Sequence, residues 1–252
     1  MLIAAIVIAS IIALFVIIYF VEPFIIALLF SWVLSLFVRN PPYVDVEEEF
    51  PEGKLLKDNW KVIREELDEV LKNIENIPKF HEVDNLQKFI SAKDDKAWRT
   101  FIIKGFNEWL DHNCEQVPRT TELIRQIPRV SMAMFSIIDG GKHIPPHYGF
   151  FKSVLRYHLA MVIPEGEVYI LVNGEKYSWT EGDHVLFDDT YKHEVWKKTD
   201  QRRVVLFIDV MREKGLPKFM QGINRWMFGI LRNSKKLQKA AKNAEVPKDI
   251  AA

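Results

Sequence analysis

The stretch EGDHVLFDDTYKHEVW, residues 181–196, decides the fold, because it sets two short apolar runs on either side of a polar turn. Three comparable segments surround it: SIIDGGKHIPPHYG at 136–149, LRYHLAMVIP at 155–164 and RRVVLFIDV at 202–210. Short apolar runs separated by close turns, with no helix between them, are typical of a β-sandwich or jelly roll. We therefore expect a mainly β domain that presents polar side chains at its mouth.

The turns in this region help to place the strands. Asn173-Gly174 lies between two apolar runs, which is the strongest short signal for a hairpin. Upstream, apolar residues at helical spacing predict flanking helices over 59–77 and around 118–126, and residues 78–100 are predicted to be largely irregular. The predicted strands are 130–138, 154–163, 168–172, 184–187, 193–197 and 203–210.

Composition limits the class of protein. The 252 residues contain 34 Lys and Arg and 34 Asp and Glu, so the net charge points to no nucleic-acid partner. The single cysteine, Cys114, excludes an internal disulfide and a cysteine zinc cluster. We divide the chain into a transmembrane anchor at 1–39, an acidic linker and helical region at 40–128, the β core at 129–213, and a basic amphipathic helix and tail at 214–252.

The first 39 residues predict a membrane segment. Residues 1–21 carry no charge, and a second apolar run covers 24–38 after Glu22-Pro23. A crossing needs about 20 apolar residues, and Pro23 favours a break. We expect a transmembrane helical hairpin, with one helix plus an interfacial segment as the rival. No Lys or Arg precedes Arg39, which disfavours a cleaved signal peptide. The cations that follow favour a domain facing the cytoplasm.

Histidines are concentrated in the predicted barrel. A lone histidine in a strand is usually structural, but several in one barrel favour a metal. His147 lies in a rigid turn after two prolines, and His193 opens a strand after an acidic turn, so we expect these two to converge, whereas His143 and His184 are predicted surface groups. Two neutral imidazoles suit Fe, Zn or Cu. The usual non-haem iron site adds a carboxylate, where this chain has Gly149, so spacing alone leaves the metal open.

An arginine follows the second histidine of this pair. Arg203 lies ten residues after His193 and begins an apolar strand. A buried arginine must be paired, and its planar fork matches a carboxylate. One interpretation is a salt bridge to Asp188 or Asp189, and the other is a clamp for an acidic small molecule. The residues alone leave both interpretations open.

These motifs occur together, in this order, in one known family. PPHYG, RYHLAMVIP, W-x-x-G-x-x-x-x-FDD, HEVW and the arginine ten residues after the second histidine resemble the aspartyl/asparaginyl β-hydroxylase family over about residues 130–211. Its bacterial membrane members include lipid A hydroxylases and ornithine-lipid hydroxylases. The resemblance implies a double-stranded β-helix, or jelly roll, that uses Fe(II), 2-oxoglutarate and O₂.

The resemblance also implies an iron site. His147 and His193 would be the metal ligands, and Asp189 would hold a metal-bound water from outside the ligand set. Glycine at position 149 is then expected, because the aspartyl hydroxylases have glycine there as well.

A cosubstrate site follows from the same resemblance. Arg203 would hold the distal carboxylate of 2-oxoglutarate, and His158 and Ser136 would also contact this cosubstrate. Arg156 would help to hold cosubstrate or substrate.

The two ends of the chain direct the choice of substrate. The tail from 214 onward has apolar residues at helical spacing with Lys and Arg between them, which suits an anionic membrane surface. Together with the apolar N-terminus, it favours a membrane lipid as partner and hydroxylation of a fatty acyl chain on lipid A or an ornithine-type lipid. The alternatives are a membrane-tethered peptidyl β-hydroxylase and a non-enzymatic jelly roll that binds lipid or protein.

Overall fold

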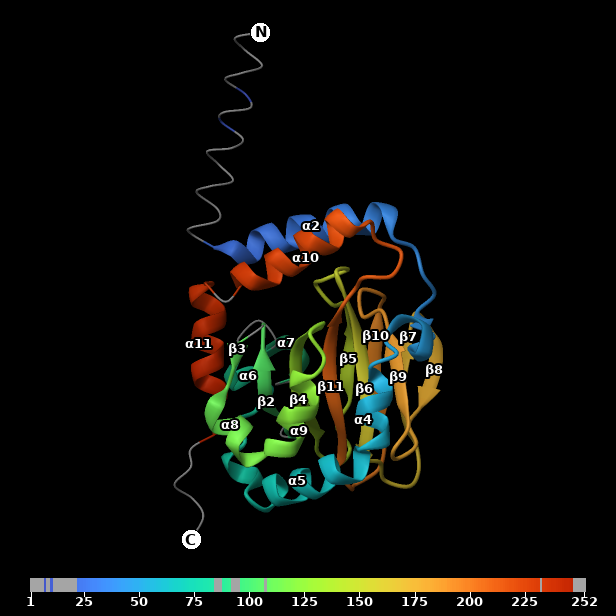
Figure 1. The fold of residues 1–252 in the computed structure, drawn as a ribbon. Coiled ribbons are helices and arrows are strands. Elements are labelled where there is room, and N and C mark those ends of the chain that lie inside the picture. The colour runs from blue at the N-terminus through green and yellow to red at the C-terminus, as the bar shows by residue number, and fades with distance from the viewer. Residues whose placement is uncertain are drawn as a thin grey trace.

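The computed structural model describes residues 22–83, 88–91, 96–106, 108–231 and 233–246, together with residues 7 and 10 (Figure 1). Two antiparallel β-sheets form its centre. Across the larger sheet the order is β1 (Tyr43–Val44), β9 (His184–Phe187), β6 (Val154–Val162), β11 (Arg203–Met211), β4 (Val130–Ile138), β2 (Trp98–Gly105) and β3 (Glu108–Trp109). Across the smaller sheet it is β5 (Ile144–His147), β10 (His193–Lys197), β7 (Val168–Val172) and β8 (Glu175–Ser178).

From β4 to β11 the chain passes repeatedly between the two sheets. β4, β6, β9 and β11 belong to the larger sheet, and β5, β7, β8 and β10 belong to the smaller one. The β7–β8 hairpin turns at Asn173 and Gly174, whose φ angles of 52° and 84° are those of a tight hairpin turn. Eight antiparallel strands distributed in this way form a jelly roll. The prediction of a mainly β jelly-roll domain with flanking helices is confirmed.

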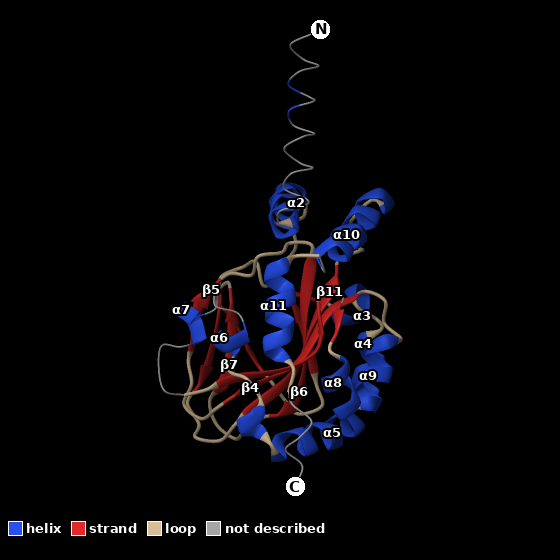
Figure 2. Cartoon of the chain, turned by 90° about the vertical axis from the view of Figure 1, so that its left-hand side faces the viewer, coloured by secondary structure: helices blue, strands red, loops and turns tan. Residues whose placement is uncertain are grey.

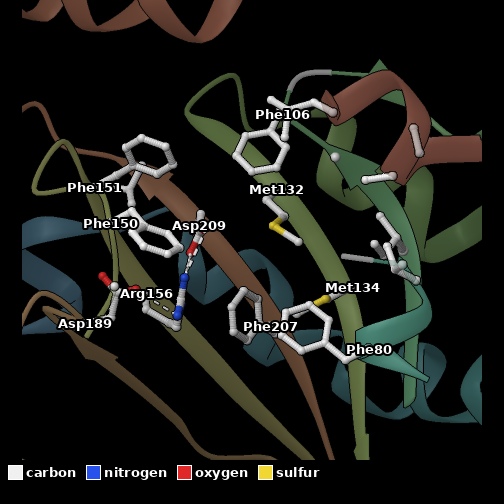
Figure 3. Close-up of a pocket in the computed structure, with 18 of the residues that line it drawn as sticks. Phe80, Phe106, Met132, Met134, Phe150, Phe151, Arg156, Asp189, Phe207 and Asp209 are labelled. Atoms are coloured by element: carbon white, nitrogen blue, oxygen red, sulfur yellow. Dashed lines mark hydrogen bonds and ion pairs between the residues drawn. The ribbon is translucent and has the colours of Figure 1, made fainter. Parts of the chain in front are cut away.

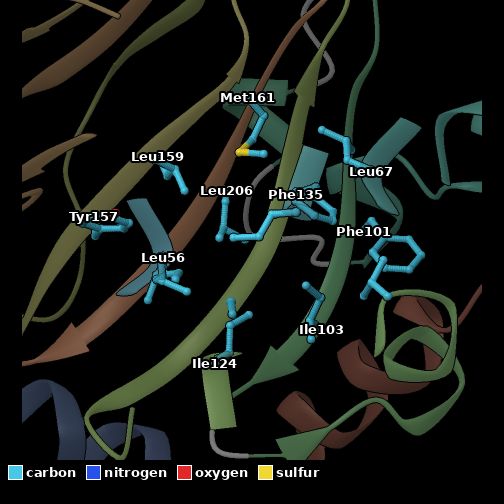
Figure 4. Close-up of a cluster of buried hydrophobic side chains, with 14 of the residues drawn as sticks. Leu56, Leu67, Phe101, Ile103, Ile124, Phe135, Tyr157, Leu159, Met161 and Leu206 are labelled. Atoms are coloured by element: carbon cyan, nitrogen blue, oxygen red, sulfur yellow. The ribbon is translucent and has the colours of Figure 1, made fainter. Parts of the chain in front are cut away.

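The outer face of the larger sheet forms the main hydrophobic core. Alternate side chains of a strand point to opposite faces, so Phe135, Leu159 and Leu206 all reach this side (Figure 4). Helices α4 (Gly53–Asp58), α5 (Trp60–Lys72) and α9 (Pro118–Arg125) cover it. In α5, Ile63, Leu67 and Val70 recur at helical spacing and are buried, as the sequence pattern predicts. The inner face is left to carry the polar groups.

Shorter helices and the C-terminal helices surround this frame. α11 lies at one edge of the domain (Figure 1 and Figure 2), where it contacts β2 and α6. The shorter helices are α3 (Val46–Glu49), α6 (Phe80–Val83), α7 (Lys88–Ser91), α8 (Asp111–Gln116) and the 3₁₀ turn Ile74–Asn76. The longer ones are α2 (Pro23–Phe37), α10 (Lys218–Leu231) and α11 (Lys235–Ala244).

Helix α2 packs on the domain. It lies beside α10 across the top of the barrel (Figure 1). Ser31 donates a hydrogen bond of 3.0 Å to the carbonyl of Phe150 and accepts one of 2.6 Å from the backbone N–H of Lys152. Ile26 and Leu34 on the same helix are buried. The second apolar run of the sequence therefore docks on the loop that follows β5.

The predicted membrane location is wrong on this structure, and so is the second half of the predicted transmembrane hairpin. Among the described residues, no helix is long and apolar enough to cross a bilayer. With 15 residues, α2 is shorter than the roughly 20 that a crossing needs. The first half of the predicted hairpin, residues 1–21, lies outside the described part of the chain apart from positions 7 and 10. One face of α2, which includes Ile26 and Ala27, packs against α10 and the loop after β5. The other face is exposed and carries Leu29, Trp32, Leu36 and Phe37.

Candidate functional site

The two histidines expected to converge lie opposite each other. His147 ends β5 and His193 begins β10, and they are direct partners in the antiparallel pair. Their ring centroids are 4.1 Å apart. The Nδ1 atoms lie 2.8 Å from the carbonyl oxygen of Pro145 and 2.9 Å from that of Tyr191, respectively. Since a carbonyl can only accept, each Nδ1 carries the proton, and each Nε2 keeps a lone pair for a metal.

Both imidazoles are held in the neutral form. Burial lowers the pKa of His147 to about 3, and the neighbouring His193 and Arg156 contribute in the same direction. Burial, followed by the charge of Arg156, lowers the pKa of His193 to about 4. Neutral imidazole is the form that binds transition metals. The pair therefore fits a divalent metal such as Fe(II).

Asp189 occupies the space beside this pair that a third protein ligand would need. A Cβ atom added to Gly149 would lie 1.9 Å from Oδ2 of Asp189 and 2.1 Å from its Cγ. The backbone N–H of Gly149 also donates to the carbonyl of Asp189 at 2.7 Å. Glycine at 149 therefore makes room for the Asp189 carboxylate. No group of three His, Cys, Asp or Glu side chains arranged to hold a metal occurs in the described part of the chain.

Arg156 fixes the position of Asp189. Its Nη1 lies 2.8 Å from Oδ2 of Asp189, and its Nη2 lies 3.0 Å from Oδ1 of Asp209 on β11 (Figure 3). Burial raises the pKa of both carboxyl groups, that of Asp209 to about 6, against the opposing charge of Arg156. Oδ1 of Asp189 has no hydrogen-bond partner among the described residues. A buried carboxylate oxygen in this state is suited to accept a hydrogen bond from a bound water.

The predicted role of Arg156 in holding cosubstrate or substrate stays a prediction. Its guanidinium already pairs with two carboxylates, so what the geometry supports directly is the positioning of Asp189.

Arg203 forms a second polar centre at the start of β11. It is only 1% exposed, and its guanidinium carbon lies 4.0 Å from the centroid of the Trp179 ring. Its Nε and Nη2 atoms lack hydrogen-bond partners within the described ranges. Asp188 and Asp189 pair with other cations. Burial lowers the pKa of Arg203 to about 9, so it stays charged at neutral pH. A buried cation with unused donors is suited to bind an anion.

Further polar groups on the inner face adjoin Arg203. Both ring nitrogens of His158 lack partners in the described chain, and after burial the charge of Arg203 is the largest cause that lowers the His158 pKa. Ser136 accepts a hydrogen bond of 3.0 Å from Nε1 of Trp98. Thr100, opposite Ser136 in the sheet, has an unpartnered hydroxyl among the described residues. This unused hydrogen-bonding capacity around a buried arginine fits a small dicarboxylate such as 2-oxoglutarate.

Three members of this region were not identified as site residues from the sequence. Trp98 and Thr100 belong to β2, within a segment predicted to be irregular. The run Thr100–Ile103, with one threonine, one phenylalanine and two isoleucines, is the signal that could have revealed the strand. Trp179 lies outside the named strands, directly after β8, and only its stacking on Arg203 shows its part in the site.

An apolar pocket of about 150 Å³ begins beside the histidine pair. Figure 3 shows Arg156, Asp189 and Asp209 together at one side of it, and Phe80 and Met134 at the other. The remaining lining is almost entirely aromatic and aliphatic. It includes His147, Phe150, Phe151, Phe207, Met132, Trp98, Ile102, Phe106, Val83, Ile90, Leu237, Ala240 and Ala241.

Comparison with known proteins agrees with this site. The profile of the Aspartyl/Asparaginyl beta-hydroxylase family matches residues 57–213. The ornithine lipid ester-linked acyl 2-hydroxylase of Rhizobium tropici is 36% identical over 189 residues, covering 72% of this chain and 66% of that protein. The aspartyl/asparaginyl beta-hydroxylase of Homo sapiens is 31% identical over 170 residues, covering 66% of this chain and 22% of that protein. This chain thus spans about two thirds of the first relative and about a fifth of the second.

Among solved structures, the Clostridium difficile EutQ protein aligns with a TM-score of 0.31 and 9% identity over 48% of this chain and 73% of its own. That likeness is too low to carry an argument. The profile match, in contrast, covers more than half of the chain and contains the histidine pair, Asp189, Arg156 and Arg203. This chain belongs to the aspartyl/asparaginyl β-hydroxylase family.

Proposed function

We propose that this protein is an Fe(II)- and 2-oxoglutarate-dependent dioxygenase that hydroxylates a fatty acyl chain of a polar lipid. The observation that carries the proposal is the apolar pocket whose polar end is formed by His147, Asp189 and Arg156. A hydrocarbon chain in that pocket would bring a C–H bond to the metal ligands without desolvating polar groups of its own.

Each residue then has a defined task. His147 and His193 would hold Fe(II) through Nε2, and Asp189 would accept a hydrogen bond from a water beside it. Arg203 would pair with the distal carboxylate of 2-oxoglutarate, with His158 and Ser136 close by. Bound Fe(II) supplies the redox chemistry: 2-oxoglutarate and O₂ yield succinate and CO₂, and one oxygen atom enters the C–H bond.

The lipid substrate has two supports. The pocket lining is largely apolar, and the charged groups beside the histidines, Arg156, Asp189 and Asp209, already pair with one another. Lys236, from α11, is the other charged side chain among the lining residues. The Rhizobium tropici relative is named for hydroxylating an ester-linked acyl chain of ornithine lipid at carbon 2. We therefore place the carboxyl end of the acyl chain at the histidines. A peptidyl aspartyl or asparaginyl hydroxylase would need free polar groups at this end to recognise a carboxylate or amide side chain.

The test is a reconstituted reaction with purified protein, Fe(II), 2-oxoglutarate, air and an ornithine lipid. We expect lipid-dependent release of succinate and a lipid product heavier by one oxygen, both lost in His147→Ala. Oxidation of an aspartate-containing peptide but not of the lipid would support the peptidyl function instead. Lipid binding with no succinate and no oxygen transfer would support a non-enzymatic binding module.

A further inference from the structure

Helix α11 contributes Lys236, Leu237, Ala240 and Ala241 to the pocket lining, and the two alanines are small. Leu237, Ala240 and Ala241 line the cavity at i, i+3 and i+4, the spacing of one helix face. Lys239 and Lys242 lie elsewhere on the helix and are exposed. Since alanine is the smallest residue with a Cβ atom, this face leaves space between the helix and the sheet where larger residues would fill it.

Both ends of α11 are tied to the rest of the domain. At its start, Ser234 caps the helix and donates a 2.6 Å hydrogen bond to Oε1 of Glu22. At its end, the fully buried Asn113 donates to the carbonyl of Ala244 at 3.1 Å and accepts from the N–H of Val246 at 2.9 Å. A helix held in this way forms a fixed wall.

The pocket runs from the histidines across the sheet towards this helix. Its lining passes from Arg156 on β6 to Phe207 on β11, Met134 on β4 and Ile102 on β2, which are four adjacent strands. Three inter-strand spacings correspond to about 14 Å. α11 in turn contacts β2 and α6. A cavity of about 150 Å³ spread over this distance has room for one short hydrocarbon chain.

We infer that α11 is the wall against which the methyl end of the acyl chain rests, so that Ala240 and Ala241 set the chain length that the enzyme accepts. This inference rests on the proposed function, because it takes the carboxyl end of the chain to lie at the histidines. The family profile ends at residue 213, before α11 begins. The wall thus lies outside the shared core, where relatives can differ in chain length while keeping the same chemistry.

The experiment compares Ala240→Phe and the milder Ala241→Leu with wild type, all as full-length chains. Lys239→Phe, on an exposed position of the same helix, is the matched control. Substrates are ornithine lipids whose ester-linked saturated chain runs from octanoyl to stearoyl. A second readout needs no turnover: the affinity for cis-parinaric acid, a fluorescent long-chain fatty acid, and its displacement by octanoate or stearate.

We expect the two alanine variants to lose at least about tenfold in kcat/KM for the longest-chain lipid that wild type turns over, since a misfit of one or two methylene groups is worth that much. The octanoyl lipid should be turned over within about twofold of wild type, and Lys239→Phe should behave as wild type. The inference would be overturned if, in both alanine variants, the ratio of turnover between that longest-chain lipid and the octanoyl lipid is unchanged and the probe affinity is unchanged. If these variants bind the probe more weakly but wild type transfers oxygen to no lipid, α11 does limit the length of the bound chain and the proposed function is refuted.

Discussion

Replacing Arg203 with methionine should stabilise the protein in the absence of cosubstrate and abolish its response to 2-oxoglutarate. Without an anion, Arg203 is a buried charge with two unpartnered donor atoms among the described residues. Methionine has a similar length and carries neither the charge nor the donors. The same change removes the proposed clamp for the distal carboxylate.

The magnitude follows from the burial of the charge. The fall in the pKa of Arg203 from 12.5 to about 9 corresponds to about 5 kcal/mol at 1.36 kcal/mol per unit. Loss of the stacking on Trp179 removes about 2 kcal/mol of cation–π attraction in a desolvated site. We therefore expect Arg203→Met to raise the free energy of unfolding of the ligand-free protein by about 3 kcal/mol.

Urea unfolding with and without 2-oxoglutarate measures both effects. At a concentration about 100 times its Kd, 2-oxoglutarate should stabilise wild type by about 2.7 kcal/mol and leave Arg203→Met unchanged. Arg202→Met is the matched control, because Arg202 is more than one third exposed and pairs with Asp139 at 3.5 Å. It should change stability by less than about 1 kcal/mol and keep the response. An Arg203→Met protein less stable than wild type, and still stabilised by 2-oxoglutarate, would refute the reasoning.

Three further changes probe the neighbouring groups. Gly149→Ala would force the Asp189 carboxylate away from its ion pair with Arg156. It should lower the free energy of unfolding by about 3–5 kcal/mol and remove most of the turnover. The control Gly222→Ala, with open space around the glycine, should raise the free energy of unfolding by up to about 1 kcal/mol. The variant His193→Ala should release no succinate in response to Fe(II). If it still does, the metal is bound elsewhere. Because burial holds the pKa of His158 well below 6.5, only the unfolded chain gains this proton as pH falls, so stability is lost below about pH 6.5. Between pH 7 and 5.5, His158→Gln should lose about 1 kcal/mol less stability than wild type, and equal losses would mean that His158 is already protonated in the fold.

Local sequence signals were sufficient for most of the barrel. Strands such as His184–Phe187 and His193–Lys197 are short apolar runs bounded by turns, and they form where the pattern predicts them. β2 was missed because the residues before it are polar and because it pairs with β4, a strand distant in sequence. No turn motif close to β2 in the sequence predicts such a pairing. As a result, the sequence could not show that Trp98 and Ile102 form part of the pocket.

The apolar N-terminal region shows a different limit of prediction from sequence. Hydropathy is the same for a helix that enters lipid and for one that packs on a neighbouring helix. Ile26 and Leu34 of α2 are buried within the domain, and Ser31 bonds to the loop after β5. The contact of this face with α10, far along the chain, could not be read from the hydropathy of α2.

The sequence predicts which residues form the candidate site, but it does not predict which of them contact one another. That His147 faces His193 depends on strand register, which no spacing in the sequence reveals. The choice between a salt bridge and a free clamp for Arg203 was likewise open until Asp188 and Asp189 were found paired with other cations. The proximity of Asp189 to Gly149 then gives a steric reason for glycine at that position.

The most direct test of the proposed function is mass spectrometry of the lipid product formed under oxygen-18 gas. A dioxygenase places one atom of O₂ in the lipid and the other in succinate. We predict an ornithine lipid heavier by one labelled oxygen, with matching label in succinate, and neither product from His147→Ala. Unlabelled hydroxylated lipid, or succinate formed at the same rate without any lipid product, would contradict the proposed function.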